Sequence, residues 1–480
     1  MSDFLGDAFL LRSHIGRALY HDHAAGLPVV DYHCHIDPQA VATDQVFEDI
    51  AQLWVASDPY KWRAMRMNGI AESRITGGAS NLDKFKAWSE TLPYTVGNPL
   101  FHWSALELKR TFCIDQSLCP QSADAIWASC NERLSTPGFT ARGLLAQAKV
   151  ETLCTSDDLL DSLDFHRRMR DEGCELRMLP SLRADRVLAL QSEAFPAFCS
   201  NLAAQTGVDI VDLDAFMVAV RLRLDVFDAL GCRVADLGLD EPFFDYVEDG
   251  QAAALFARLL AGHVLDAAPL LQLKSNLLVA MGVEYHRRGW MMQLHIGAKR
   301  DTSERLRLLT GQAGGYACIG KSSDVATVCR LLDRLERIAS LPRTLLFSLN
   351  PSDTEMFASL AGSFTEGGVP GKVQFGPAWW LNDHRDGIER QLRAFGNLGL
   401  LSRHIGMTTD SRSLLSYSRH EYYRRILCNM LGEWVEAGEL PNDQELLARM
   451  VRDICYFNAR NCLESATATS TRFTIQQEVP

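Results

Sequence analysis

Two histidines separated by one residue, His33 and His35, come directly after the apolar run Leu27–Tyr32. Side chains alternate along an extended strand, so both imidazoles are expected on the same side. Two neutral imidazoles placed in this way can share one divalent metal ion. A bare His-x-His pair is equally compatible with two structural histidines in a loop, so further ligands are needed to decide between the two interpretations.

Two more candidate ligands follow other apolar runs. His295 comes after Met291–Leu294, and Asp410 comes after Gly406–Thr409. If these runs are parallel strands, their polar ends meet at one edge of the sheet, together with the His-x-His pair. The set favours one divalent metal, and zinc is the expected ion because the ligands are nitrogen and oxygen atoms. His295 has two alternative roles, a hydrogen bond to a substrate or packing in the core.

Asp410, His33 and Tyr60 are the candidates for catalysis. A carboxylate partly withdrawn from water can reach a raised pKa and shuttle a proton, so we expect Asp410 to act as a base; its alternative is a purely metal-binding role. A metal held by His33 would polarise substrate oxygens. Tyr60 lies in the aromatic stretch 58–62, where its phenol could donate or relay a proton. Aromatic residues in such a segment more often serve packing.

Arg183, Arg412, Trp379 and Trp380 are the candidates for holding a substrate. A planar guanidinium pairs bidentately with a carboxylate, so the two arginines are predicted to grip the hydroxyls and the carboxylate of an anionic substrate. Their alternative role is a surface or structural ion pair. The two tryptophans could form a wall against an apolar face of the substrate, and they fit a place in the core equally well.

Eight short apolar runs that end in polar residues are the predicted strands. They are Leu27–Tyr32, Val150–Cys154, Arg177–Ser181, Cys232–Ala235, Trp290–Leu294, Thr344–Leu349, Val373–Phe375 and His404–Thr408. Segments with helical apolar spacing lie between most of them, which predicts an α/β protein with a parallel sheet. Eight such units indicate a closed (β/α)8 TIM-type barrel with its reactive groups at the C-terminal ends of the strands. A doubly wound open sheet is the rival, but no glycine fingerprint follows any strand.

The spacing of the strands also predicts the domain organisation. More than 110 residues separate the first two predicted strands, which indicates an insertion between them. We expect an N-terminal helix and the first barrel strand in 1–37, a mostly helical cap in 38–142, the rest of the barrel in 143–464, and a C-terminal tail rich in Ser and Thr in 465–480. The cap is expected to pack over the mouth of the barrel.

Composition limits the partners and the compartment. The 480 residues carry a formal net charge of −12, which argues against nucleic acid as a partner because binding phosphate needs clustered Lys and Arg. The 13 cysteines form no C-x-x-C pair, and the N-terminus lacks the basic and apolar order of a signal peptide. No stretch reaches the ~20 apolar residues that span a membrane. We expect a cytoplasmic protein that forms a homo-oligomer and binds a small anionic molecule.

Several longer stretches carry a resemblance to a known family. They are Asp31–His35, Asp58–Arg66, Gln293–Gly297, Gly371–Gly376, Thr409–Ser413 and Ser418–Arg425. On these residues the chain resembles the uronate isomerase family of the amidohydrolase superfamily over nearly its whole length. The superfamily's mononuclear metal ligands lie on the first, fifth and eighth strands, which correspond here to the His-x-His pair, His295 and Asp410.

The resemblance implies an aldose–ketose isomerase with a hexuronate substrate. The family converts D-glucuronate to D-fructuronate and D-galacturonate to D-tagaturonate, with a proton moving from C2 to C1 through a cis-enediol or enediolate. It implies that Asp410 is the base and that Arg183 and Arg412 hold hydroxyls and the C6 carboxylate. It also implies one divalent metal, expected to be zinc, which the reaction need not strictly require.

The chain departs from the family pattern at one position, and other features bear on the alternative functions and on the surface. The family commonly has Asp-His-Gly where this chain has Asp236-Leu237-Gly238, so a polar contact at 237 is in doubt. The sixth predicted strand ends without a histidine, which counts against the main alternative, a metal-dependent amidohydrolase-type hydrolase. A sugar-acid-binding protein without catalysis is the third interpretation. The basic cluster in 419–425 is interpreted as a solvated or interface face of a helix.

Overall fold

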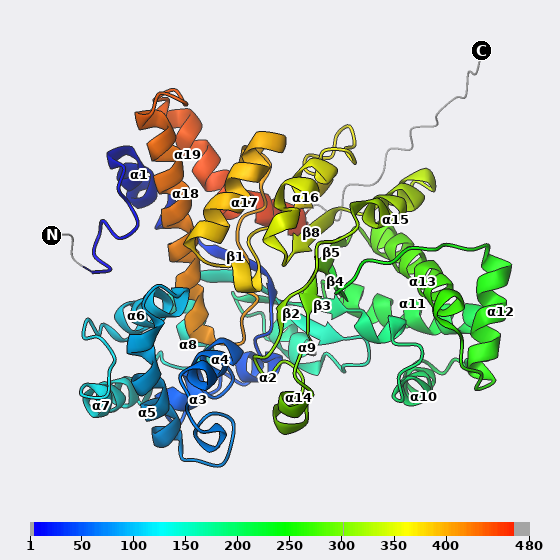
Figure 1. Ribbon diagram of the computed structural model, residues 1–480, viewed down its shortest axis with the longest axis horizontal. Coiled ribbons are helices and arrows are strands. Elements are labelled where there is room, and N and C mark those ends of the chain that lie inside the picture. The colour runs from blue at the N-terminus through cyan, green and yellow to red at the C-terminus, as the bar shows by residue number, and fades with distance from the viewer. Residues whose placement is uncertain (1–3, 301, 465–480) are drawn as a thin grey trace.

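A seven-stranded parallel β-sheet forms the centre of the protein in a computed structural model that describes residues 4–300 and 302–464 (Figure 1). The strand order is β1-β2-β3-β4-β5-β8-β9, and a separate antiparallel pair joins β6 to β7. The strands are β1 (Val29–Cys34), β2 (Val150–Asp158), β3 (Arg177–Arg183), β4 (Val234–Leu239), β5 (Met291–Ile296), β6 (Ala298–Lys299), β7 (Cys318–Ile319), β8 (Thr344–Ser348) and β9 (Val373–Phe375).

Helices follow most of the strands, so the protein has a mixed α/β fold. Before β2 they are α1 (His14–Leu19), α2 (Pro38–Ala42), α3 (Ile50–Trp54), α4 (Pro59–Met67), α5 (Asn81–Thr91), α6 (Pro99–Phe112), α7 (Ala123–Leu134) and α8 (Ala141–Gln147). After β2 they are α9 (Asp164–Asp171), α10 (Phe195–Thr206), α11 (Leu213–Ala229), α12 (Asp249–Leu260), α13 (Ala267–Arg288), α14 (Glu304–Thr310), α15 (Val325–Arg337), α16 (Thr354–Ala361), α17 (Arg385–Leu398), α18 (Ser418–Glu436), α19 (Gln444–Arg452) and α20 (Asn458–Glu464).

Seven of the predicted strands coincide with strands of the central sheet. β1 and β5 are buried at every position, as expected for parallel strands covered on both faces. The predicted boundaries differ by a few residues, because an apolar run does not show where ladder hydrogen bonds stop. Asp236, predicted at the end of the fourth strand, lies inside β4, and His33 lies inside β1.

The predicted eighth strand, His404–Thr408, is wrong, because this segment is not a strand in the structure. It nevertheless lies between β9 and β1. It does not form a strand because amides on both sides donate to side-chain oxygens instead of backbone carbonyls. The Ile405 amide donates to Gln374 Oε1 at 3.1 Å on β9, and the Thr409 amide donates to Asp31 Oδ1 at 2.8 Å on β1. The segment therefore contacts both edges of the sheet without forming a regular backbone ladder.

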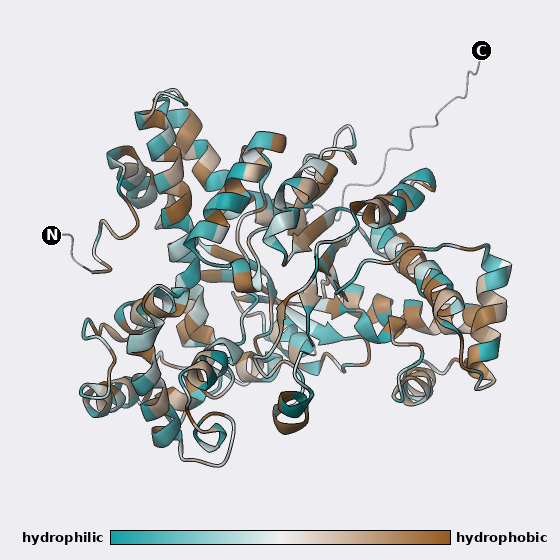
Figure 2. Cartoon of the chain, in the orientation of Figure 1, coloured by the Kyte–Doolittle hydropathy of each residue, from teal (hydrophilic) through white to brown (hydrophobic). Residues whose placement is uncertain are grey.

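Helix α15 buries one face and exposes the other. In α15, predicted within Asp324–Ile338, the buried residues recur at helical spacing, and the Asp324 side chain caps the N-terminus by accepting from the Ala326 amide. Figure 2 shows both hydrophobic and hydrophilic residues along the outer helices. The helices α2 to α8 all lie between β1 and β2, where an insertion was predicted; its division into a separate cap at 38–142 stays a prediction.

The basic cluster of α18 is buried, which corrects its interpretation as a solvated or interface face. Arg419, Arg424 and Arg425 are each at most 5% exposed. The Arg424 guanidinium donates to the backbone carbonyls of Leu27 and Pro28, just before β1. These carbonyls come from a distant part of the chain, so charge patterning along the helix alone could not show that the cluster faces inward.

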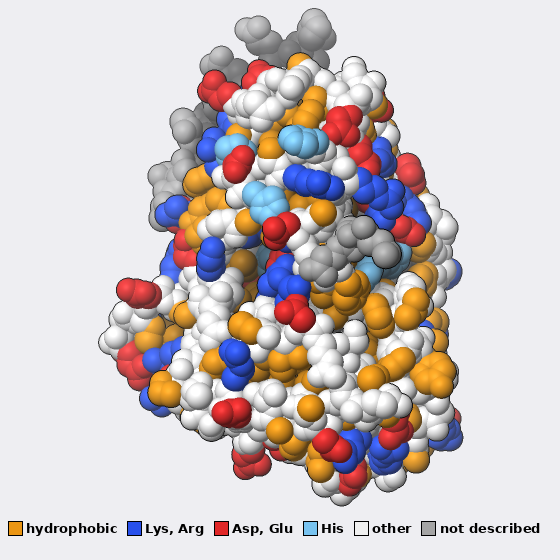
Figure 3. Space-filling model, turned by 90° about the vertical axis from the view of Figure 1, so that its left-hand side faces the viewer, with side chains coloured by type: hydrophobic (Ala, Val, Ile, Leu, Met, Phe, Trp, Pro, Cys, Tyr) orange, Lys and Arg blue, Asp and Glu red, His pale blue; other side chains and the backbone are white. Residues whose placement is uncertain are grey.

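The surface shows mixed charge on the face drawn in Figure 3, where acidic and basic side chains lie interspersed. None of the described helices combines the length and apolar character that a membrane-spanning helix needs. The predicted C-terminal tail, 465–480, lies outside the described residues.

Candidate active site

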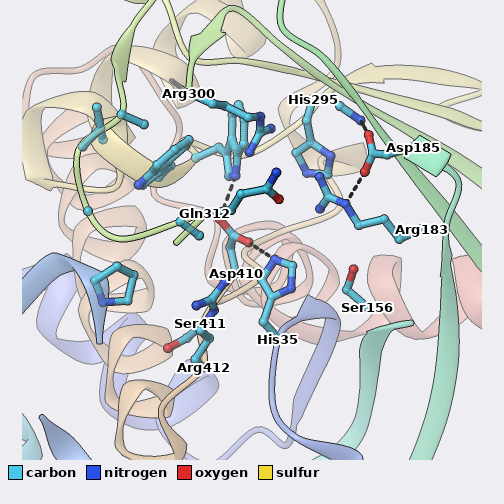
Figure 4. A pocket seen from close by; sticks show the side chains of 18 of the residues that line it. His35, Ser156, Arg183, Asp185, His295, Arg300, Gln312, Asp410, Ser411 and Arg412 are labelled. Carbon is cyan, nitrogen blue, oxygen red and sulfur yellow. Dashed lines mark hydrogen bonds and ion pairs between the residues drawn. The ribbon is translucent and has the colours of Figure 1, made fainter. Parts of the chain in front are cut away.

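The last residues of β1 to β5 line a cavity of about 920 Å³ at the C-terminal edge of the sheet (Figure 4). Helix α4 and the loop after α14 line it as well, and a cavity of this size suits a small-molecule ligand. The polar and aromatic side chains that line it include His33, His35, Tyr60, Arg63, Arg183, Asp185, Asp240, His295, Arg300, Gln312, Trp379, Trp380, Asp410 and Arg412. All the predicted site residues therefore lie around one cavity.

Asp410 lies at the centre of the predicted metal-ligand set. Its Oδ1 is 3.3 Å from His33 Nε2 and 3.1 Å from His35 Nε2, and its Oδ2 accepts a hydrogen bond from Trp379 Nε1 at 2.8 Å. Potential ligand atoms of Asp410 and the two histidines lie within 4.8 Å of one another, which is close enough to hold one metal ion. The strand geometry of the His-x-His pair thus directs both imidazoles to one carboxylate.

His295 extends this site into a second group of potential ligands. Its ring centroid is 4.8 Å from that of His33, and potential ligand atoms of His33, His295 and Asp236 also lie within 4.8 Å of one another. Both ring nitrogens of His295 are buried and have no hydrogen-bond partner among residues 4–300 and 302–464. Buried polar atoms are rarely left unpaired, so these nitrogens fit a role in binding a metal or a substrate.

The charges at Asp410 differ from the expectation. Burial raises the pKa of Asp410, but hydrogen bonds from His33 and His35, and the positive charge of these imidazoles, outweigh burial and hold the pKa well below its usual value. The expected raised pKa of Asp410 is therefore wrong, because the two imidazoles stabilise the ionised carboxylate. Burial lowers the pKa of His35, and it lowers the pKa of His295 far more, so the His295 imidazole is neutral.

Asp31 holds the segment that carries Asp410. This carboxylate is fully buried in β1 and accepts hydrogen bonds from the Thr408 hydroxyl at 2.6 Å and from the Thr409 amide at 2.8 Å. The Asp410 amide then donates to the His33 carbonyl at 3.0 Å. The first residue of the motif Asp31–His35 therefore positions Asp410, while the histidines of the motif contact its carboxylate.

The two predicted arginines lie in different surroundings. Arg183, the last residue of β3, pairs with Asp185, and its Nη1 is 3.1 Å from Asp236 Oδ2, so two carboxylates hold it at the cavity wall. Arg412 lines the cavity and is exposed, and among the described residues it has no ion-pair partner. Arg412 is therefore the freer of the two to pair with an anion that enters the cavity.

The predicted aromatic residues surround the same space. Burial raises the pKa of Tyr60 well above its usual value, so the phenol is protonated, and its hydroxyl has no hydrogen-bond partner among the described residues. Trp379 lies against His295, with ring centroids 4.8 Å apart, and Trp380 is next to it. Trp379 lines the cavity, and its indole nitrogen also donates a hydrogen bond to Asp410.

A family model described as glucuronate isomerase matches residues 1–463 of the chain. The chain belongs to the glucuronate isomerase family. Among its curated relatives is a uronate isomerase of Bacillus licheniformis, 43% identical over 461 residues that cover 96% of this chain and 98% of the relative. A uronate isomerase of Salmonella newport is 45% identical over 464 residues, 96% of this chain and 99% of the relative. Each alignment covers nearly the whole length of this chain and of the uronate isomerase to which it is similar.

Solved structures of the glucuronate isomerase family have the same fold. The uronate isomerase of Thermotoga maritima aligns with a TM-score of 0.90 at 31% identity and covers 96% of this chain and 99% of its own. The glucuronate isomerase of Caulobacter crescentus aligns with a TM-score of 0.88 at 23% identity, over 95% of this chain and 96% of its own, a likeness of fold alone.

Leu237, at which this glucuronate isomerase family member departs from the usual histidine, lies outside the cavity. Leu237 is 5% exposed and packs in the core, while Gly238 lines the cavity. Side chains alternate along β4, so a residue at 237 points away from the cavity. Asp236 does not hydrogen-bond to His295, since Oδ2 is 4.0 Å from His295 Nδ1, and it binds Arg183 instead.

Sequence reasoning missed several residues that line this cavity. Arg300 lines the cavity four residues after β5, with its Nε on Asp240 Oδ1 at 2.9 Å and its guanidinium 5.7 Å from the Trp380 ring centroid. Its place beyond a strand end was the signal that could have found it. Gln312 also lines the cavity, but it follows α14 in a loop and no local pattern marks it.

Proposed function

We propose that this member of the glucuronate isomerase family interconverts open-chain hexuronates and their 2-keto isomers, D-glucuronate with D-fructuronate and D-galacturonate with D-tagaturonate. One observation carries the proposal: in a cavity that arginines also line, the carboxylate of Asp410 lies 3.3 Å from the His33 imidazole and 3.1 Å from the His35 imidazole. The names of the relatives, uronate isomerases at 43% and 45% identity, support the same substrate class.

Asp410 is the proposed base that moves the proton from C2 to C1. Its low pKa keeps it ionised at neutral pH, and only the ionised form can accept a proton. The same carboxylate can return the proton at C1 once the cis-enediol or enediolate has formed. Without a bound metal, His33 and His35 would stabilise the carboxylate before transfer, through the contacts at 3.3 and 3.1 Å.

One divalent metal ion fits the donor atoms, and we propose that it is held by His33, His35 and Asp410 with His295 beside it. Zinc suits this mixture of nitrogen and oxygen ligands, and we do not expect it to be strictly required. When bound, the ion supplies Lewis-acid polarisation of the substrate oxygens. His295 can alternatively hydrogen-bond to a substrate hydroxyl, since both its ring nitrogens are unpaired among the described residues.

The remaining residues would bind and orient the sugar. Arg412 and Arg183, which both line the cavity, are the proposed partners of the C6 carboxylate and nearby hydroxyls. Tyr60, protonated and unpaired among the described residues, is the proposed proton donor to a sugar oxygen. Trp379 and Trp380 would pack against the apolar face of the substrate.

We also propose a closed (β/α)8 barrel, in which the segment after β9 stands for the eighth strand. Its side-chain-mediated contacts to both sheet edges support this. The helices α2 to α7 would form a cap at 38–142. We further propose a cytoplasmic homo-oligomer; the 13 free cysteines suit a reducing compartment, and the mass in solution tests the assembly.

Proton NMR with D-glucuronate and D-galacturonate in deuterium oxide tests the proposed function. We expect the matching ketose to form from at least one of the two, with deuterium entering C1 to the extent that the protonated base exchanges with solvent. A parallel reaction with a chelator shows whether the metal contributes. No conversion of either uronate, with or without added zinc, would sink the proposal and favour a hydrolase.

A further inference from the structure

Arg419 is a buried arginine that lies behind the cavity rather than in its lining. It comes from α18, and its side chain is 3% exposed. Its Nε donates to Asp383 Oδ2 at 3.0 Å, and its Nη2 donates to the same oxygen. Arg419 is not among the residues that line the cavity, so any effect on the reaction must pass through its neighbours.

The guanidinium of Arg419 packs against two aromatic residues of the helices between β1 and β2. Its central carbon is 4.5 Å from the ring centroid of Trp103, on α6, and 5.9 Å from that of Tyr60, on α4. The two rings meet edge to face, with centroids 6.0 Å apart. The Tyr60 hydroxyl has no hydrogen-bond partner among the described residues, so these ring contacts orient it.

Asp383 connects Arg419 to the turn that follows Trp379. It directly follows the short helical turn Trp380–Asn382, and its amide donates to the Trp380 carbonyl at 3.1 Å. Trp379, at the start of that turn, donates its indole hydrogen bond to Asp410 at 2.8 Å. One guanidinium therefore contacts Tyr60 on one side and, through Asp383 and the tryptophan turn, is linked to Asp410 on the other.

A purely structural role explains this arrangement poorly. A buried ion pair gains little net stability over well-packed apolar residues, because desolvation opposes the attraction between the charges. A planar cation that stacks on aromatic rings and binds a carboxylate, in contrast, fixes directions as well as distances. Tyr60 and Asp410 lie on separate elements, so their joint action on a substrate would require both their directions and their distance to be fixed.

We propose that Arg419 is a positioning residue, which holds Tyr60 at a fixed place relative to Asp410. The proposal rests on the proposed function, because it needs Tyr60 to act on the substrate.

A double-mutant cycle tests the proposal, with Arg419→Met, Tyr60→Phe and the double variant assayed on whichever hexuronate the wild type isomerises. We expect Arg419→Met to lower kcat by about 10- to 100-fold, as displacement of a reacting group does, and to change KM little. In the Tyr60→Phe background the same substitution should lower kcat by less than about twofold, because there is no hydroxyl left to position.

Arg425→Met is the matched control. Arg425 is buried on the same helix, bonds to Glu421 and stacks on Tyr20 with its central carbon 4.2 Å from the ring centroid. We expect this variant to lose thermal stability while keeping the wild-type kcat. A loss of kcat equal to that of Arg419→Met would overturn the positioning role.

The outcomes separate the two proposals. If Tyr60→Phe is impaired but Arg419→Met has the same effect in both backgrounds, positioning is wrong and the proposed function stands. Wild-type turnover in Tyr60→Phe overturns the role of Tyr60 and its positioning together. If Arg419→Met does not fold, Arg419→Lys replaces it in the cycle; it keeps the charge but not the planar stacking, so kcat should fall while the melting temperature stays near that of the wild type.

Discussion

Asp410, the proposed base, has an unusual local conformation. Its backbone has a φ of 49°, in the left-handed region that costs energy for most residues with a side chain, although Asp tolerates it better than most. Three side chains hold its carboxylate, those of His33, His35 and Trp379. The strain is therefore offset by contacts that aim the carboxylate into the cavity.

Asp410→Asn removes the base and keeps the shape of the side chain. We expect kcat to fall by about 10²- to 10⁴-fold, the usual contribution of a general base, while substrate still binds. Steady-state kinetics measure the loss, and isothermal titration measures binding. Asp324→Asn is the control, because Asn caps α15 as well as Asp does and the residue lies far from the lining. Wild-type turnover in Asp410→Asn would falsify the base assignment.

His35→Ala tests the metal site at the same scale. Removing one of the proposed ligands should weaken metal binding by at least about tenfold, so that the purified variant carries much less zinc than the wild type. Elemental analysis after dialysis measures the content, and circular dichroism shows whether the fold is kept. The exposed His263, replaced by alanine, serves as control. Equal zinc in all three proteins would rule out His35 as a ligand.

At the scale of elements, the loop after α14 docks on α4 and lines the cavity. Arg66 donates to the Gly314 carbonyl and Arg63 donates to the Ala317 carbonyl. Gly315 has a φ of 84°, and a Cβ placed there would meet the Pro59 carbonyl oxygen at 2.5 Å. The loop can approach the helix this closely only because residue 315 has no side chain.

Gly315→Ala should push this loop away from α4. Gln312 lies in the same loop and lines the cavity, so we expect KM to rise by about tenfold, which corresponds to about 1.4 kcal/mol. Gly368→Ala is the control, since it has a φ of 83° but no atom within 4 Å of an added Cβ. It should lower thermal stability alone. If both variants raise KM equally, the docking contact does not shape the cavity.

At the scale of the whole molecule, burial keeps several histidines neutral. Burial lowers the pKa of His166 to about 4 and that of His404 to about 3. His404 is fully buried, where its Nδ1 accepts from the Gly406 amide at 3.0 Å and its ring lies edge-on to Phe395. In the unfolded chain a histidine has a pKa near ~6.5, so the unfolded state binds more protons as the pH falls below that value.

The free energy of unfolding should therefore fall as the pH is lowered from about 6.5 towards 3, by ~1.4 kcal/mol per pH unit for each such histidine. His404→Asn keeps an acceptor for the Gly406 amide but cannot titrate in this range. Urea unfolding at pH 7 and pH 5 should show a smaller pH dependence in this variant than in the wild type. The exposed His263→Asn is the control, and equal pH dependence in His404→Asn and the wild type would contradict the assignment.

The sequence by itself determined the central sheet and most of the site. Seven predicted strands were found because buried parallel strands are continuous apolar runs, which are visible locally. The His-x-His pair and His295 were found because they lie at the ends of parallel strands, which meet at one edge of the sheet. Asp410 reaches the same edge although the apolar run before it forms no strand. The family motifs in 31–35 and 409–413 support the same set.

Only the tertiary structure decided how these residues interact. Asp31 and Thr408 are 377 residues apart in sequence, and their hydrogen bond replaces part of the ladder of an eighth strand. The pKa of Asp410 falls rather than rises because two imidazoles from the other end of the chain contact it. The buried Arg419 likewise meets Tyr60 only in the folded chain. A local pattern encodes periodicity and burial, whereas hydrogen bonding, charge and position at the site depend on neighbours that only folding brings together.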